Sequence, residues 1–265
     1  MSLHRTLAAV LVAAGFGGLS SAVLGADLPA RMPTKAPFIG APYNWTGFYL
    51  GANGGYGWSG QTVGVNFDVS AVQTVLSDIP GVHDIAGNAK GGLGGAQLGY
   101  NWQAGRMVYG IELDFDGADI SSSQDTQAIF VVSRTFHGEQ KLDTFGTLRA
   151  RLGYTPADRL LVYATGGLAG GHASATADLT TDDGCAGICF NGSTSKTMWG
   201  WAAGAGVEYA VTGNWSVKAE YLHYDLGTLN TVGPPQVLPA VFGNLDGSVK
   251  INGNIVRAGL NYKFD

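Results

Sequence analysis

The sequence has little charge and, beyond its first segment, no long apolar run. Lys, Arg, Asp and Glu make up 13% of the 265 residues, about half of what soluble domains usually carry. After residue 26, no stretch reaches the roughly eighteen consecutive apolar residues of a membrane-spanning helix. Because no such helix is present, any membrane role must be played by strands. The net charge of −5 also argues against nucleic acid as a partner.

Cysteine is scarce as well. Cys185 and Cys189 are the only two, and both lie in one polar, glycine-rich segment. A redox pair or a metal site would be expected to show a Cys-x-x-Cys motif or histidines nearby. In an oxidising, exported compartment this spacing favours a small loop disulfide, which fixes a loop tip and carries no chemistry.

The N-terminus has the pattern of a secretory signal peptide. His4 and Arg5 precede an apolar run from Leu7 to Leu19, and small residues follow up to Ala26. We predict a signal peptide over residues 1–26, with cleavage after Ala26 in preference to Ala22. The mature protein is then exported.

The remaining chain divides into a lead-in and one domain. Residues 27–42 contain four prolines, which favour an extended periplasmic segment over a packed element. Residues 43–265 have the length of one all-β domain.

The last strand of the chain alternates with a period of two. Apolar residues 256, 258, 260, 262 and 264 share one face, and the intervening positions, including Arg257, are mostly polar. About ten residues with period two is the length of a tilted strand that crosses a bilayer. We predict that Tyr262 and Phe264 form the signal read by the barrel-assembly machinery.

The same alternation recurs in eight segments separated by connections of two lengths. The segments cover residues 48–58, 96–102, 107–116, 142–154, 160–171, 199–209, 215–224 and 254–264. Short turns at 103–106, 155–159 and 212–214 alternate with long connections at 60–90, 117–141, 172–196 and 226–252. This layout predicts an eight-stranded antiparallel up-and-down transmembrane β-barrel with short periplasmic turns and four long extracellular loops.

Which face meets lipid needs separate evidence, because a soluble lipocalin-like barrel alternates too. Aromatic residues gather at the strand ends, as in interfacial girdles, and the middles of the apolar faces carry no charge. The polar faces carry both signs, which suits the narrow interior of an eight-stranded barrel. We therefore predict that the apolar faces point to outer-membrane lipid.

The polar faces predict an ion-pair network that fills the lumen. Glu112, Asp114 and Asp116 lie on one strand and are expected to face Arg149 and Arg151 in a salt-bridge stack, in preference to a divalent metal site. The lumen network is predicted to comprise Glu112, Asp114, Asp116, Arg149, Arg151, Glu208, Lys218, Glu220 and Arg257.

Several motifs resemble those of a known family. Asn44-Trp-Thr-Gly-Phe-Tyr-Leu-Gly-Ala-Asn-Gly-Gly-Tyr-Gly-Trp58 and Thr147-Leu-Arg-Ala-Arg-Leu-Gly-Tyr154 are similar to strands of small outer-membrane barrels of α-proteobacterial type. These are porin-family surface antigens related to the transmembrane domain of outer-membrane protein A. The resemblance implies the outer membrane of a Gram-negative bacterium and a structural, surface-antigen or limited permeability role. Some such relatives are described as hemin-binding.

Three functional hypotheses follow. The first, which we favour, is a structural surface antigen with a largely plugged lumen, at most weak pore activity and no cofactor. The second is a receptor whose loops bind heme or a host ligand. The third is a lipid-modifying enzyme using His172 and Ser174, which we do not favour because two residues along a strand span roughly 6 to 7 Å. The candidate heme-binding residues are His83, His137, His172, His223, Phe67, Phe136, Phe190 and Phe242.

Overall fold

The computed structural model describes residues 43–59, 61–67, 84–129, 133–181, 190–233 and 245–264. The predicted signal peptide, the proline-rich lead-in, both cysteines, His83, Phe242 and Asp265 lie outside these ranges. Within the described ranges, no helix is long and apolar enough to cross a membrane.

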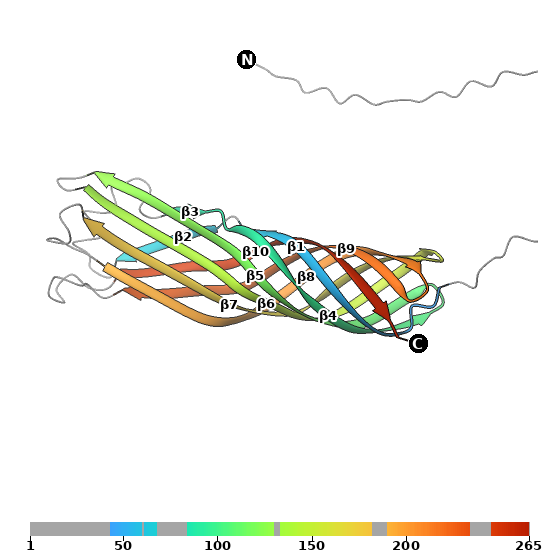
Figure 1. The fold of residues 1–265 in the computed structure, drawn as a ribbon. Coiled ribbons are helices and arrows are strands. Elements are labelled where there is room, and N and C mark those ends of the chain that lie inside the picture. The colour runs from blue at the N-terminus through green and yellow to red at the C-terminus, as the bar shows by residue number, and fades with distance from the viewer. Residues whose placement is uncertain are drawn as a thin grey trace, which may run out of the picture. The chain divides into compact units, whose positions relative to one another are not determined.

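Eight long strands form a closed ring in chain order, each antiparallel to its neighbours (Figure 1). The ring closes because β1 pairs with β10 from Tyr49 opposite Lys263 to Trp58 opposite Asn254. The predicted eight-stranded up-and-down barrel is therefore confirmed. The strands of the ring are β1 (Gly47–Trp58), β4 (Lys90–Ala104), β5 (Met107–Ile129), β6 (Ser133–Ala157), β7 (Leu160–Thr181), β8 (Phe190–Thr212), β9 (Trp215–Gly233) and β10 (Leu245–Lys263).

The three short turns lie at one end of the barrel. Gly105 and Gly213 occupy two of them with φ of +62° and +48°, a left-handed conformation that favours glycine. The ends of the barrel domain lie at the same end, where the Phe264 N–H donates to the Phe48 carbonyl at 2.8 Å. Because outer-membrane barrels keep their short turns in the periplasm, this end is the periplasmic one.

The predicted long loops are largely wrong, because the strands continue into them. In the segment predicted as loop 117–141, β5 runs on to Ile129 and β6 already begins at Ser133. The segment 60–90 contains a hairpin of β2 (Gln61–Phe67) and β3 (Asp84–Gly87), and β2 pairs with β10. Beyond the hydrophobic belt the outer face of a strand meets water, so the apolar alternation on that face fades while the backbone ladder continues.

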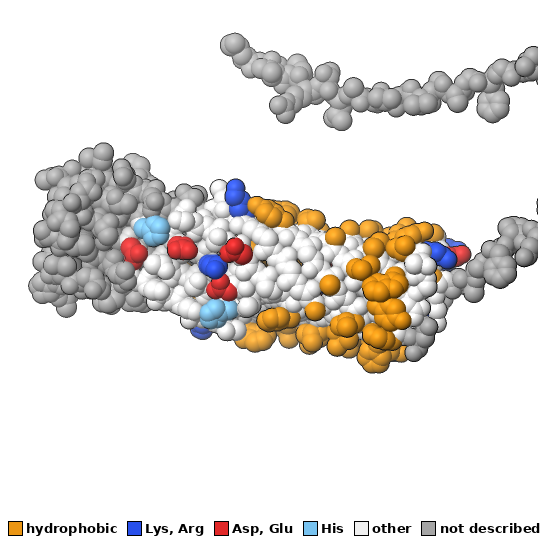
Figure 2. Space-filling view, in the orientation of Figure 1, with side chains coloured by type: hydrophobic (Ala, Val, Ile, Leu, Met, Phe, Trp, Pro, Cys, Tyr) orange, Lys and Arg blue, Asp and Glu red, His pale blue; other side chains and the backbone are white. Residues whose placement is uncertain are grey.

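The outside of the ring is apolar and the inside is polar. The large hydrophobic residues on the outer face keep between 39% (Trp58) and 74% (Trp199) of their surface exposed. Figure 2 shows these side chains as a belt, with Lys, Asp and His side chains appearing beyond it. A soluble barrel would have the opposite polarity, so the predicted lipid-facing side is the observed outer side.

A register shift in β6 reverses part of one predicted face. The pairing shifts between Leu142 and Thr144, so Arg149 and Phe145 point inward at odd positions whereas Leu142 is buried inside at an even one. Asp143 has the same odd position as Arg149, which alternation alone would place inside, but it pairs with Lys141 at 3.0 Å on a partly exposed surface. Alternation alone cannot show such a β-bulge, since it changes the side without changing the composition.

The interior holds apolar side chains at both ends of the charged residues. A periplasmic cluster comprises Trp45, Val108, Leu161, Tyr163 and Ala210. An outer cluster draws on β4 to β10 and includes Ile120, Leu142, Leu222, Leu226 and Ile251. The predicted charged network therefore lies between two apolar layers.

Candidate functional site

All nine residues predicted for the lumen network are buried inside the barrel. They are the buried charged residues among those the structure describes, five carboxylates and four cations. They come from β5, β6, β8, β9 and β10, in each case from the face opposite the lipid belt. A buried charge is stable only when it is paired and hydrogen-bonded, so the contacts of each decide whether the arrangement holds.

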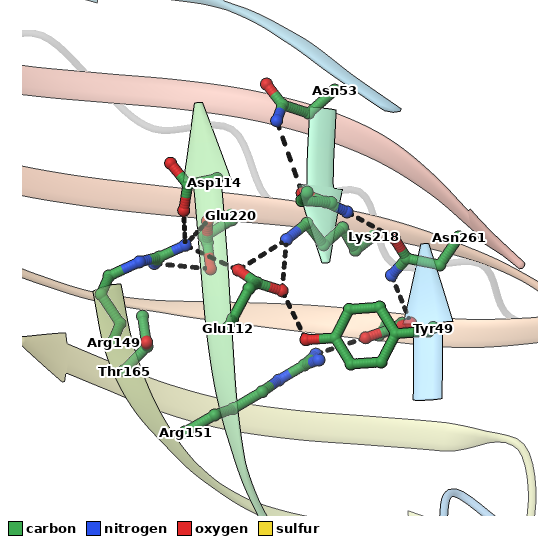
Figure 3. A network of polar contacts seen from close by, with 12 residues as sticks. Tyr49, Asn53, Glu112, Asp114, Arg149, Arg151, Thr165, Lys218, Glu220 and Asn261 are labelled. Atoms are coloured by element: carbon green, nitrogen blue, oxygen red, sulfur yellow. Dashed lines mark hydrogen bonds and ion pairs between the residues drawn. The ribbon is translucent and has the colours of Figure 1, made fainter. Parts of the chain in front are cut away.

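Arg149 is one centre of the network. It lies directly across the ladder from Glu112, and its Nη2 donates to Glu112 Oε1 at 2.6 Å and to Asp114 Oδ2 at 2.9 Å. Across the lumen, Nη1 reaches Glu220 Oε1 at 3.1 Å (Figure 3). One guanidinium thus joins three carboxylates from two sides of the barrel.

Arg257 is the second centre. It faces Glu220 across the β9–β10 ladder and donates from Nε to Glu220 Oε2 at 2.7 Å. Its Nη1 spans the lumen to Asp114 Oδ1 at 3.2 Å and Asp116 Oδ2 at 3.1 Å. Together the two arginines tie β5 and β6 to β9 and β10 across the interior.

Arg151 and Asp116 depart from the predicted stack. Arg151 pairs with Glu208 of β8, and its guanidinium carbon lies 3.6 Å from the centre of the Tyr163 ring. Asp116 pairs with Arg257 and with neither of the two predicted arginines. The prediction that Arg149 and Arg151 face all three acids of β5 is therefore wrong in its partners. Side-chain alternation places a residue inside but does not select which strand it reaches.

Neutral side chains add hydrogen bonds to two of these carboxylates, Asp114 and Glu208. Thr147 donates to Asp114 Oδ2 at 2.5 Å, and Ser216 donates to Glu208 Oε1 at 2.5 Å. Asn261 Nδ2 donates to the same Glu208 oxygen at 2.8 Å. These residues were not predicted for the network, although their inward parity in the strand pattern could have indicated them.

Glu112 also receives two contacts from outside the arginine centres. Lys218 Nζ lies 3.0 Å from both of its carboxylate oxygens, and the Tyr49 hydroxyl donates to Oε2 at 2.7 Å (Figure 3). Tyr49 belongs to β1, so this bond links the first strand to the network. Glu112 therefore collects donors from β1, β6 and β9.

Removing the Tyr49 hydroxyl tests that link. We expect Tyr49→Phe to lower the free energy of unfolding by about 1.5 to 3 kcal/mol, because a hydrogen bond to a buried charge is lost. Urea unfolding of the refolded barrel, followed by tryptophan fluorescence, measures this. Tyr56→Phe, on the outer face of the same strand, is the matched control and should change little. Equal effects of the two substitutions would contradict the assignment.

The predicted heme ligands are distributed over several strands. His137, His172 and His223 belong to β6, β7 and β9. His223 Nδ1 lies 3.0 Å from Asn254 Oδ1, and its ring packs 5.5 Å from that of Trp201. The side chains of Phe67, Phe136 and Phe190 are not among those that the structure describes. The three described histidines therefore come from three different strands.

His172 contacts a serine other than the one considered from the sequence. Its Nε2 lies 2.7 Å from the Ser195 Oγ of β8, whereas Ser174 is a neighbour along its own strand. A hydroxyl beside an imidazole is a common polar contact. The prediction against catalysis concerned His172 and Ser174, and it stays a prediction.

The chain was compared with known proteins. Residues 30–264 match the family described as outer membrane protein beta-barrel domain. The 31 kDa outer-membrane immunogenic protein of Brucella melitensis biotype 1 is 39% identical over 237 residues, 88% of each chain. The 25 kDa outer-membrane immunogenic protein of Brucella abortus biovar 1 is 29% identical over 266 residues, 98% of this chain and 100% of that one.

Among solved structures, the chain is similar to the outer membrane protein OprG from Pseudomonas aeruginosa. The TM-score is 0.51 at 14% sequence identity, over 83% of this chain and 96% of that one. At this identity the likeness concerns the fold alone.

Proposed function

Because this chain belongs to the outer membrane protein beta-barrel domain family, we propose that it is a structural surface antigen whose lumen is largely closed and has at most weak pore activity. The family resemblance predicted from its strand motifs is confirmed, and the protein is an outer-membrane protein of a Gram-negative bacterium. Two relatives that cover most of the chain are named as immunogenic outer-membrane proteins, which supports the antigen role.

The proposal of a closed lumen rests on the buried side chains that occupy the barrel along its axis. Passing from the periplasmic end outward, a solute meets the apolar cluster around Val108 and Leu161, then nine buried charges, then the apolar cluster around Leu222 and Ile251. An eight-stranded barrel is only wide enough for its own side chains. Near Ser59 and Tyr224 the interior leaves a pocket of about 20 Å³, roughly the space of one water.

Planar bilayer recordings test this proposal. We expect the refolded wild-type protein to show no large, steady channels, because a hydrated ion would have to break paired charges and cross two apolar layers. Large, long-lived conductance in every insertion would contradict the closed lumen. Bilayers that receive the same amount of detergent without protein control for leakage caused by the detergent.

Two finer expectations belong to the same proposal. We expect the terminal aromatics Tyr262 and Phe264 to be read by the barrel-assembly machinery, and the loops to present the antigenic surface. Tyr262 packs against Trp215 with ring centres 5.1 Å apart and against Phe264 at 5.2 Å.

Loop binding of heme remains a hypothesis that no described contact favours, and a Soret titration of the purified protein would decide it.

A further inference from the structure

A hollow in the lipid-facing wall is floored by glycine. On the outer face of β5 to β8, Phe115, Gly146, Gly170 and Trp199 stand side by side in register across four strands. An added Cβ on Gly170 would lie 2.8 Å from the Trp199 ring, and one on Gly146 would lie 3.5 Å from the Phe115 ring. The Trp199 ring thus lies against Gly170, the Phe115 ring lies against Gly146, and both glycines line the trough between the two rings without side chains of their own.

The trough continues toward the middle of the membrane. The next row of residues, Leu113, Leu148 and Leu168, is also in register and faces outward. The hollow has a volume of about 430 Å³. In a bilayer the surroundings of this part are acyl chains, because the side chains beside it belong to the hydrophobic belt: Leu113, Phe115, Leu148, Leu168 and Trp199.

The outer end of the trough is polar. Thr144, His172 and Thr197 form the row directly above the glycines, and all three line the hollow. The His172 N–H of the backbone donates to Thr144 Oγ1 at 3.3 Å, and the imidazole contacts Ser195. We call Thr144, His172, Ser195 and Thr197 the polar ledge.

The charge around this ledge is nearly balanced. Lys141, on the same strand as Thr144, lies 3.0 Å from Asp143 and 3.8 Å from Asp119, and the hydrogen bond from its ammonium to Asp143 raises the pKa of Lys141. Recognition at the ledge would therefore depend on hydrogen bonds from hydroxyl and imidazole groups more than on net charge. Sugar hydroxyls and acyl ester or amide carbonyls are suitable partners.

We propose that this hollow is a binding site for one lipid A molecule of the outer leaflet, with an acyl chain on the Gly146–Gly170 floor and the glucosamine head at the polar ledge. The ledge lies at the extracellular end, since the short turns mark the periplasmic end. The hollow has one polar end and one apolar end, which is the polarity of a lipid and not that of a second barrel. This site goes beyond the proposed antigen role and does not depend on a closed lumen.

Native mass spectrometry of the refolded full chain in detergent, with added lipid A, tests the site. We expect one bound lipid A per wild-type barrel and about tenfold weaker binding for Gly170→Leu, which fills the floor, and for Trp199→Ala, which removes a wall. Trp199 is 74% exposed, so its ring can turn away and Gly170→Leu should still fold. His172→Ala tests the ledge separately and is expected to weaken binding while leaving the trough open.

A second hollow on the same wall supplies the matched control. It is lined by Tyr109, Ile111, Leu152 and Gly166 toward the periplasmic end and has a volume of about 540 Å³. A Cβ on Gly166 has no neighbour closer than 3.8 Å, so Gly166→Leu should fold and leave lipid A binding unchanged. Phosphatidylethanolamine in place of lipid A should bind weakly.

Four results would overturn the proposal: no retained lipid A on the wild type, equal loss for Gly166→Leu and Gly170→Leu, unchanged binding by Trp199→Ala, or equal binding of phosphatidylethanolamine. A dimer that disappears with Trp199→Ala and carries no lipid would assign the trough to a second copy of the chain. Heat-modified mobility on semi-native gels checks that each variant is folded before its binding is compared.

Discussion

Arg149→Ala is expected to lower the free energy of unfolding by about 3 to 5 kcal/mol, because removing one partner leaves uncompensated charges in a buried site. Arg149 is the donor shared by Glu112, Asp114 and Glu220. Without it, Asp114 keeps Arg257 and Glu112 keeps Lys218, but only three cations remain for five buried carboxylates. Urea unfolding in lipid vesicles and heat resistance on semi-native gels measure the loss.

A second arginine gives the matched control. Arg106 lies in a periplasmic turn and its Nη1 contacts the exposed Tyr154 hydroxyl at 3.3 Å. Arg106→Ala should change stability by no more than about 0.5 kcal/mol, as surface substitutions usually do. If the free energy of unfolding fell by the same small amount in both arginine variants, the network would not contribute to stability in the way its geometry indicates.

Gly95→Ala is the other substitution with a large expected effect. Gly95 lies on the inner face of β4, opposite Asp116 of β5. Its added Cβ would lie 2.0 Å from the Phe115 carbonyl oxygen and 2.7 Å from the Asp116 Cα. These are backbone atoms, so β4 and β5 would have to separate, which also draws Asp116 away from Arg257. We expect a loss of about 3 kcal/mol, the upper range for overpacking.

Gly92 is the control for this test because it belongs to the same strand and faces outward. A Cβ there would lie 4.0 Å from the Gly55 carbonyl oxygen, an ordinary contact. Gly92→Ala should leave stability unchanged or raise it by up to about 1 kcal/mol, since alanine restricts the unfolded chain. The measurement is the same urea titration. Similar losses at both positions would show that chain entropy or strand propensity, and not inner crowding, accounts for the glycines.

The two classes of glycine explain why the chain is so rich in this residue. Inner glycines such as Gly95 and Gly204 lie where a Cβ would meet a backbone carbonyl at about 2.0 Å. Outer glycines such as Gly54 and Gly92 have no neighbour closer than 3.9 Å, and the outer Gly146 and Gly170 line the proposed lipid trough. The sequence showed the abundance, and the register of the strands separated the two uses.

The strand pattern by itself determined, for most residues, whether the side chain points into the barrel or outward to lipid. Because side chains in a strand alternate strictly, the inward position of Glu112, Arg149, Glu220 and Arg257 followed from period two and from the absence of charge on the other face. The alternation of short and long connections likewise determined the number of strands and which end is periplasmic. The sequence motifs, similar to those of a known family, agreed with both.

Tertiary structure alone decided which of those residues meet. Arg151 reaches Glu208 and Asp116 reaches Arg257 because closing the ring of strands brings distant segments together across the lumen. The bulge at Asp143, the outer strand extensions and the trough between Phe115 and Trp199 depend in the same way on register between strands. Alternation carries information along one strand, whereas partners across the barrel are set by its closure.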